Sequence, residues 1–125
     1  MTDARLTLIE RFFTAIETND FATIEAIYAD DVIVWHNSDN KEKDKTGSLK
    51  ILRSVFGFLT TPRYEVLRRY TVPGGVAQSH ILHAERPDGT PFAINAAIFF
   101  ECDENHITRL EEFVDGDTFR RQMKA

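Results

Sequence analysis

The chain has 125 residues, of which 42% are hydrophobic and 28% are charged, and its formal net charge at pH 7 is −5. A chain of this length ordinarily forms one domain and buries a core without disulfides or a structural metal. We therefore expect a single domain over residues 1–125. Nucleic-acid binding is disfavoured, because phosphate contacts need clustered lysines and arginines on a basic surface.

The sequence carries no signal for a cofactor, a metal or a membrane. Cys102 is the only cysteine, which excludes an intramolecular disulfide and a metal site built from cysteines. His80 and His83 have a spacing that puts their rings on opposite faces of a strand, and Gly74–Gly75 indicates a hairpin turn rather than a phosphate loop. No apolar signal segment or membrane-spanning stretch is visible. We expect a cytoplasmic protein without cofactor or metal.

The spacing of apolar residues predicts helices first and strands afterwards. Asn19–Asp20 ends the first helix and caps the second, and the polar segment 37–47 predicts a mobile surface loop. Asp115 precedes the last helix and is expected to cap it. In chain order we expect helices over 3–18, 21–29 and 49–59, a helix at 117–124, and strands over 32–36, 64–72, 76–86, 90–102 and 106–115.

The last four predicted strands are separated by short turns that contain proline, glycine, aspartate or asparagine. Such connections join antiparallel neighbours, so these strands form a meander. Helices that precede a meander cover one face of the sheet. The expected fold class is therefore α+β, with a curved antiparallel sheet packed against the helices.

The turn between the second and third strands of the meander decides which side chains face the helices. With a turn centred on Asp88–Gly89, His83 lies opposite Ile94 and Glu85 lies opposite Phe92. Alternate residues of the third strand are apolar and are expected to be buried. Their cross-strand neighbours Ser79, His83 and Glu85 are then polar groups on an apolar surface, which indicates a site. The same register places His80 at the surface, and His106 falls in a turn.

Two segments resemble a known family. The first runs from Asn19-Asp20-Phe21 through Ile27-Tyr28-Ala29-Asp30-Asp31-Val32 to Trp35-His36, and it is similar to the second helix and first strand of ketosteroid isomerases and SnoaL-like polyketide cyclases. The second, residues 107–115, resembles the last strand of the SnoaL-like branch. The chain is identified as a member of the nuclear transport factor 2-like superfamily. The resemblance implies a cone-shaped curved sheet wrapped around the N-terminal helices, also called a cystatin-like α+β barrel.

The resemblance implies roles for particular positions. The general base of the ketosteroid isomerases falls on His36, but their tyrosine donor falls on Phe12, and their aspartic acid falls near Ala97 or Ile98. Neither side chain can hold an oxyanion, so the chain is not a ketosteroid isomerase. The arginine between two carboxylates that epoxide hydrolases of this fold require is also absent from the predicted inward face.

The last strand supplies a further candidate. The cavity-lining phase implied by the resemblance falls on Glu112, opposite Ala96, although a slip of one residue would exchange it for Glu111. We expect His36, His83 and Glu112 to be the catalytic acid–base groups. The residues expected to contact a small apolar ligand are Phe12, Tyr28, Trp35, Glu85, Ile98, Leu110 and Val114.

Two hypotheses follow. The first is an acid–base enzyme of the isomerase, cyclase or hydrolase type that acts on a small hydrophobic organic substrate, with the loop 37–47 at the mouth of its pocket. The second is a non-catalytic ligand-binding or dimerisation module, in which the polar groups only satisfy one another. Both include a homodimer formed through the outer face of the sheet. Its expected apolar residues are Leu67, Leu82, Ala93, Ala97, Phe99 and Phe113.

Overall fold

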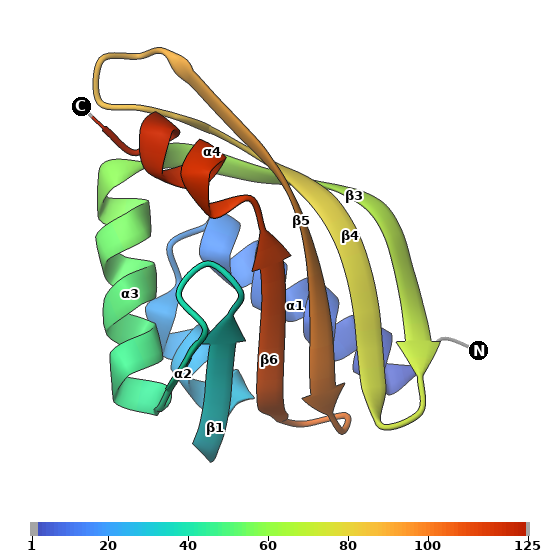
Figure 1. Cartoon of the computed structure of the whole chain (residues 1–125). Helices are drawn as coiled ribbons and strands as arrows, with labels where there is room; N and C mark the ends of the chain where they lie inside the picture. Colours follow the sequence, from blue (N-terminus) through green and yellow to red (C-terminus); the bar gives the residue numbers. More distant parts are fainter. Residues whose placement is uncertain (1–2, 125) are drawn as a thin grey trace.

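The computed structural model describes residues 3–124 and has the expected α+β architecture, with helices packed on one face of a six-stranded sheet (Figure 1). The helices are α1 (Ala4–Glu17), α2 (Phe21–Ile27), α3 (Lys45–Phe58) and α4 (Gly116–Gln122). The strands are β1 (Tyr28–His36), β2 (Lys41–Lys43), β3 (Thr60–Val72), β4 (Gly75–Glu85), β5 (Pro91–Cys102) and β6 (Ile107–Val114).

Aspartates begin the helices, as the sequence indicated. Asn19 adopts a left-handed φ of 58° after α1, and the Asp20 side chain accepts a hydrogen bond from the Thr23 amide. The predicted cap of α4 is confirmed, because the Asp115 carboxylate accepts from the amides of Asp117 and Thr118. The prediction that the second helix reaches residue 29 is wrong. Strand β1 already begins at Tyr28.

The segment 37–47 is not the loop that its polarity suggested. Residues Lys41–Lys43 form β2, which pairs with the end of β1, and α3 begins at Lys45. Asn40, with a left-handed φ of 55°, turns the chain and donates its amide hydrogen to the His36 carbonyl. A short, charged strand is a usual way to end a sheet, so the lysines and acids here mark an edge rather than disorder.

The sheet has the order β2-β1-β6-β5-β4-β3 and is mixed rather than wholly antiparallel. Strands β3 to β6 form the predicted antiparallel meander, whereas β1 pairs with β6 in parallel. The sheet curves without closing into a barrel, and its concave face holds the helices (Figure 1). The core lies between α1 and this face, where Phe12 and Phe100 meet edge to face. Within residues 3–124, no helix combines the length and apolarity needed to span a membrane.

The predicted register of β4 against β5 is wrong by one residue. Leu82, not His83, lies opposite Ile94. The β-turn begins at Arg86, whose carbonyl accepts from the Gly89 amide, and Gly89 adds a left-handed residue with φ 82°. The hairpin is therefore centred on Asp88 rather than between Asp88 and Gly89, and the one-residue shift in register reverses the face of every β4 side chain. Ser79, Ile81, His83 and Glu85 point away from the helices, and Gln78, His80, Leu82 and Ala84 point toward them.

This shift overturns two further expectations. His80 is only 1% exposed, so it is not a surface residue. Leu82 is buried and does not belong to the outer face. The exposed position of His106 is confirmed.

Candidate functional site

A cavity of about 260 Å³ lies between the concave face of the sheet and the helices α1 and α3. One small side chain, Ala96, is among the residues that line it. The inward residues of β5 are large except Ala96, which lies between Val114 and His80 on the neighbouring strands. Most lining residues are apolar and come from every layer around the space. They include Phe12, Phe13, Ile16, Val55, Phe56, Leu82, Ile94, Ile98 and Leu110.

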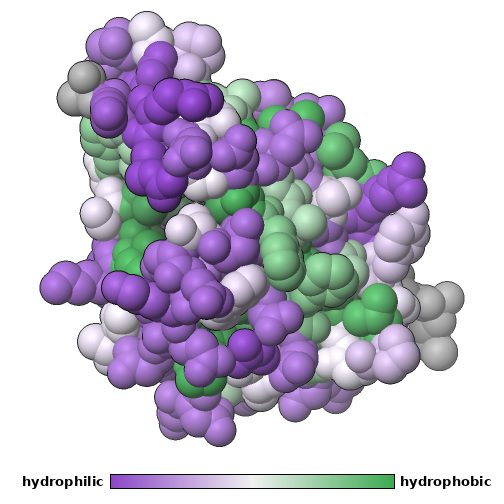
Figure 2. All heavy atoms as spheres, in the orientation of Figure 1, coloured by the Kyte–Doolittle hydropathy of each residue, from purple (hydrophilic) through white to green (hydrophobic). Residues whose placement is uncertain are grey.

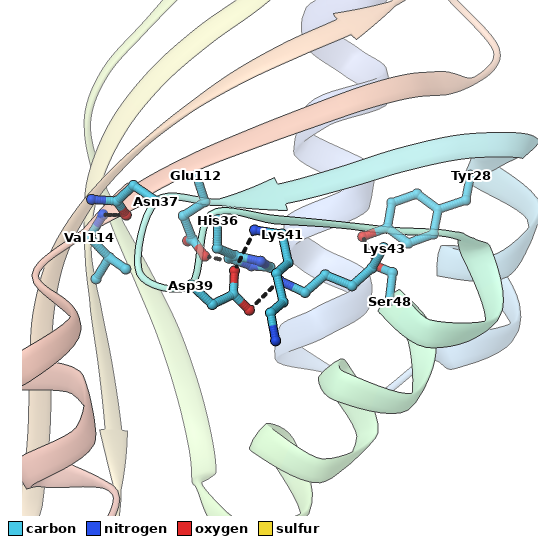
Figure 3. A network of polar contacts seen from close by, with 9 residues as sticks. All are labelled: Tyr28, His36, Asn37, Asp39, Lys41, Lys43, Ser48, Glu112 and Val114. Carbon is cyan, nitrogen blue, oxygen red and sulfur yellow. Dashed lines mark hydrogen bonds and ion pairs between the residues drawn. The ribbon is translucent and has the colours of Figure 1, made fainter.

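An ion pair borders this cavity at the ends of two parallel strands. His36 is the last residue of β1 and lies beside Glu112 of β6, with 3.2 Å between His36 Nε2 and Glu112 Oε1 (Figure 3). Asn37 holds the two strands in this register, because its amide donates to the Glu112 carbonyl and its Oδ1 accepts from the Val114 amide. Glu112 therefore faces inward as predicted, although it lies opposite Ile98 rather than Ala96.

A second charged pair closes the rim beside His36. Lys43 Nζ lies 2.5 Å from Asp39 Oδ2, and the Asp39 carboxylate also accepts from the Lys41 amide (Figure 3). The hydrogen bond from Lys43 is the main reason that the pKa of Asp39 is lowered, and nearby His36 lowers it further. Asp39 and Lys43 both line the cavity, so its mouth is polar while its walls are apolar.

Two tyrosines present phenol groups to the cavity. The Tyr28 hydroxyl lies 3.4 Å from Ser48 Oγ, and the Tyr64 ring packs against Phe13 and His80. Burial raises the pKa of both phenols above their ordinary value, and the negative charge of Glu112 raises them further. Both hydroxyls are consequently neutral at physiological pH and keep a proton to donate.

His80 lines the cavity and is held from behind by a chain of two side chains. Arg69 Nε lies 2.6 Å from Gln78 Oε1, and Gln78 Nε2 lies 2.8 Å from His80 Nδ1. Desolvation lowers the pKa of His80, Glu112 opposes that shift and Arg69 adds to it. His80 is therefore held in its neutral form inside the cavity wall.

Comparison with known proteins places this architecture in a family. The model of the SnoaL-like domain matches residues 9–110. The chain belongs to the SnoaL-like domain family. A comparison with proteins of curated function finds no match.

Solved structures share the fold of this SnoaL-like chain. A protein classed as a SnoaL-like polyketide cyclase, from Shewanella putrefaciens CN-32, has a TM-score of 0.83 at 16% identity, with 98% of each chain covered. A protein with a ketosteroid isomerase-like fold from Catenulispora acidiphila, in complex with trimethylamine, has a TM-score of 0.78 at 11% identity over 93% of this chain and 91% of that one. A protein of M. tuberculosis described as an LEH-like epoxide hydrolase has a TM-score of 0.77 at 17% identity, with 96% of this chain and 89% of that chain covered. The TM-scores show that these proteins share the fold. The sequence identities are too low to transfer a reaction, which must be argued from the residues of this chain.

The structure brings together only part of the predicted site of the SnoaL-like chain. His36 and Glu112 meet at the cavity, whereas His83 lies on the outer face, 2.8 Å from Glu65. Trp35 also points outward, where its indole nitrogen donates to Asn40. Glu85 is exposed on the outer side. The predicted ligand contacts that do line the cavity are Phe12, Tyr28, Ile98, Leu110 and Val114.

Sequence reasoning missed His80 and the two residues that hold it. The available signal was the turn Arg86-Pro87-Asp88-Gly89, in which proline suits the second position of a β-turn and glycine the left-handed residue after it. That assignment shifts the register of β4 against β5 by one residue and turns His80 inward. The contribution of Arg69 had no such signal, because a bulge in β3 between Val66 and Arg68 sets its face.

Proposed function

We propose that this SnoaL-like domain binds a small, mostly apolar organic molecule in the cavity and transfers a proton on it, with Glu112 as the acid–base group and His36 as its partner. One observation carries the proposal. Glu112 is a carboxylate at the wall of an apolar cavity, paired through one oxygen only. General bases need this combination of access and orientation.

The geometry of the pair suggests how the proton moves. His36 Nε2 lies beside Glu112 Oε1, and Glu112 Oε2 has no hydrogen-bond partner within residues 3–124. In the proposed step, Oε2 takes a proton from a C–H or O–H group of the substrate, and the electron pair of that bond stays on the substrate. The protonated carboxyl can return the proton at another atom. Isomerase, cyclase and hydrolase reactions all use such a transfer.

The walls define the kind of substrate. A cavity of about 260 Å³ admits a molecule of one or two small rings, and its aromatic and aliphatic lining favours an apolar body. The Glu112 side chain is partly exposed, so an apolar substrate that displaces water from it would strengthen the interactions that its charge makes. Relatives described as a polyketide cyclase and an epoxide hydrolase support a substrate of this organic class.

The proposal can be tested with nitrobenzisoxazole, a small neutral aromatic compound. Removal of its one acidic C–H proton breaks the ring N–O bond and releases a coloured cyanophenolate, so the reaction needs only a base in an apolar site. We expect the wild-type protein to accelerate ring opening, and Glu112→Gln to lower the rate by about 100-fold or more. Glu111→Gln is the matched control, because Glu111 faces outward and pairs with Arg109.

Two results would count against proton transfer. One is an equal rate for Glu112→Gln and wild type, and the other is no acceleration by the wild type at all. If the compound still binds in the second case, the non-catalytic ligand-binding hypothesis takes its place. A dissociation constant from fluorescence or calorimetry separates the two cases.

We also propose that the chain forms a homodimer through the convex face of the sheet. Phe113 contacts Trp35 and Phe99 edge to face there, and Phe99 is 50% exposed. Leu67 is equally exposed on β3. Hydrophobic residues gather over β5 and β6 on this face (Figure 2). Aromatic side chains left in water at such density favour association.

Sedimentation equilibrium tests the dimer. We expect twice the monomer mass at micromolar concentration and a shift toward monomer for Phe113→Lys. A wild-type protein that sediments as a monomer at tens of micromolar would refute the pairing.

A further inference from the structure

His80 occupies a fixed position opposite the proposed acid–base pair. Cross-strand pairing aligns Glu112, Ile98 and Gln78 in one row over the concave face. His80 lies two residues further along β4, in the row that contains Ala96 and therefore beside the space that alanine leaves. The rings of Phe13 and Tyr64 contact the imidazole edge to face, at centroid distances of 5.4 and 5.0 Å. The ring is held in one orientation.

The hydrogen-bond chain behind the ring determines which nitrogen carries the proton. The Arg69 guanidinium has only donors, so the Gln78 atom that it contacts must be the carbonyl oxygen. The amide nitrogen of Gln78 then faces His80 and donates to Nδ1. Nδ1 must accept with its lone pair, so the proton of the neutral imidazole lies on Nε2.

Nε2 has no partner among residues 3–124. In the same part of the chain, every fully buried side-chain nitrogen and oxygen has a partner, so Nε2 is not sealed in the core. The cavity is the space that His80 lines. A hydrogen-bond donor with fixed direction is therefore aimed into a cavity whose walls are mostly apolar.

We propose that His80 is a specificity-determining residue whose Nε2–H donates to an uncharged oxygen acceptor on the ligand, such as the carbonyl oxygen of a ketone, aldehyde or ester. This inference rests on the proposed function, since it takes the cavity to be the ligand site. Arg69 and Gln78 are positioning residues that act only through the imidazole.

The surroundings select this class of acceptor. A hydrocarbon at Nε2 would leave the N–H unpaired, and an ammonium group would place one N–H donor against another. An anionic oxygen would enter a cavity that already contains the Glu112 charge. A carbonyl group on an apolar body accepts the hydrogen bond from Nε2–H and brings no second negative charge into the cavity.

The tautomer can be measured without any ligand. A long-range proton–nitrogen correlation spectrum of the isotope-labelled protein at neutral pH separates protonated from unprotonated ring nitrogens. We expect His80 to have an unprotonated Nδ1 and a protonated Nε2. A proton on Nδ1, or a doubly protonated ring, would overturn the proposal. His83, whose ring lies outside on the same strand, serves for comparison.

The ligand preference is tested with acetophenone and α-methylstyrene, which have nearly the same shape but differ in the carbonyl oxygen. We expect the wild type to bind acetophenone roughly five- to tenfold more tightly in calorimetric or NMR titrations, the usual contribution of one neutral hydrogen bond. His80→Phe should abolish the preference, whereas His83→Phe should retain it.

The outcomes distinguish the two proposals. Equal affinities for the two compounds in the wild type would overturn the role of His80 and leave the cavity as a ligand site. Binding of neither compound would overturn both, because the cavity would not accept an apolar molecule of this size. If His80→Phe does not fold, the tautomer spectrum and the wild-type preference still decide the question.

Discussion

Two histidines three residues apart on β4 lie on opposite faces of the sheet. His80 lies on the concave face, 1% exposed, where it contacts Gln78 and two aromatic rings. His83 lies on the convex face and pairs with Glu65 in solvent. The same side chain is thus a neutral, oriented donor on one face and a solvated ion-pair partner on the other. The face, rather than the residue type, decides the chemistry.

The contrast extends across the sheet. Inward side chains surround the cavity and carry two polar sets, the partly exposed His36 with Glu112 and the buried His80 with Gln78. Outward side chains form exposed charge pairs and an exposed aromatic group around Phe113. Substitutions matched across the two faces test how far this division holds.

The largest expected difference is in the free energy of unfolding, between substitutions of two adjacent phenylalanines of β5. Phe100 is 2% exposed and packs against Phe12 and Phe13, whereas Phe99 is 50% exposed. Phe100→Ala should lower the free energy of unfolding by about 3–5 kcal/mol, because it leaves a void in the core. Phe99→Ala should cost under about 1 kcal/mol in the monomer. Urea denaturation measures both, and similar values would mean that the core and outer faces are misassigned.

The next difference concerns two alanines of β5. Ala96→Phe should fill the cavity and weaken acetophenone binding by roughly 100-fold, because the phenyl ring occupies the space that the ligand would take. Ala93→Phe lies on the outer face and should leave binding unchanged. Calorimetric titration of both variants checks this, with thermal unfolding as the control for folding. Unaltered binding by Ala96→Phe would place the ligand elsewhere.

A smaller effect is expected in the pH dependence of stability. Burial, with a contribution from Arg69, lowers the pKa of His80 in the folded state, while the charge of Glu112 opposes the shift. Below about pH 6.5 the unfolded chain therefore binds a proton at this histidine more readily than the folded chain. The free energy of unfolding should fall as the pH drops from there toward the lower pKa of the folded state. His80→Phe should reduce this slope.

The slope is obtained from urea denaturation at a series of pH values. Equal slopes for wild type and His80→Phe would show that His80 is not buried as a neutral group.

The smallest effect concerns the outer pair of His83 and Glu65. Both side chains are partly exposed, and exposed pairs contribute about 0.2–1 kcal/mol, with screening by salt. A double-mutant cycle with His83→Ala and Glu65→Ala should give a coupling free energy in this range that shrinks at high salt. A larger, salt-independent coupling would indicate that another chain covers this part of the convex face.

The fold class and the starts of the first, second and last helices could be predicted because their signals are local. Asp20 and Asp115 cap helices through contacts within three residues, and apolar spacing defines the helices that follow. The inward phase of Glu112 came from the resemblance. The segment 37–47 could not be predicted correctly, because charged residues suit a loop and an edge strand equally.

The sequence by itself determined that one curved sheet covers the N-terminal helices and that Glu112 and His36 are candidates for a site. Apolar periodicity and helix capping depend on residues close together in the sequence, so they can be recognised without knowing how the rest of the chain folds. Only the tertiary structure decided that His80 replaces His83 at the cavity. A single left-handed residue, Gly89, shifts the hairpin by one position, and with a side-chain period of two that shift exchanges the faces of a whole strand.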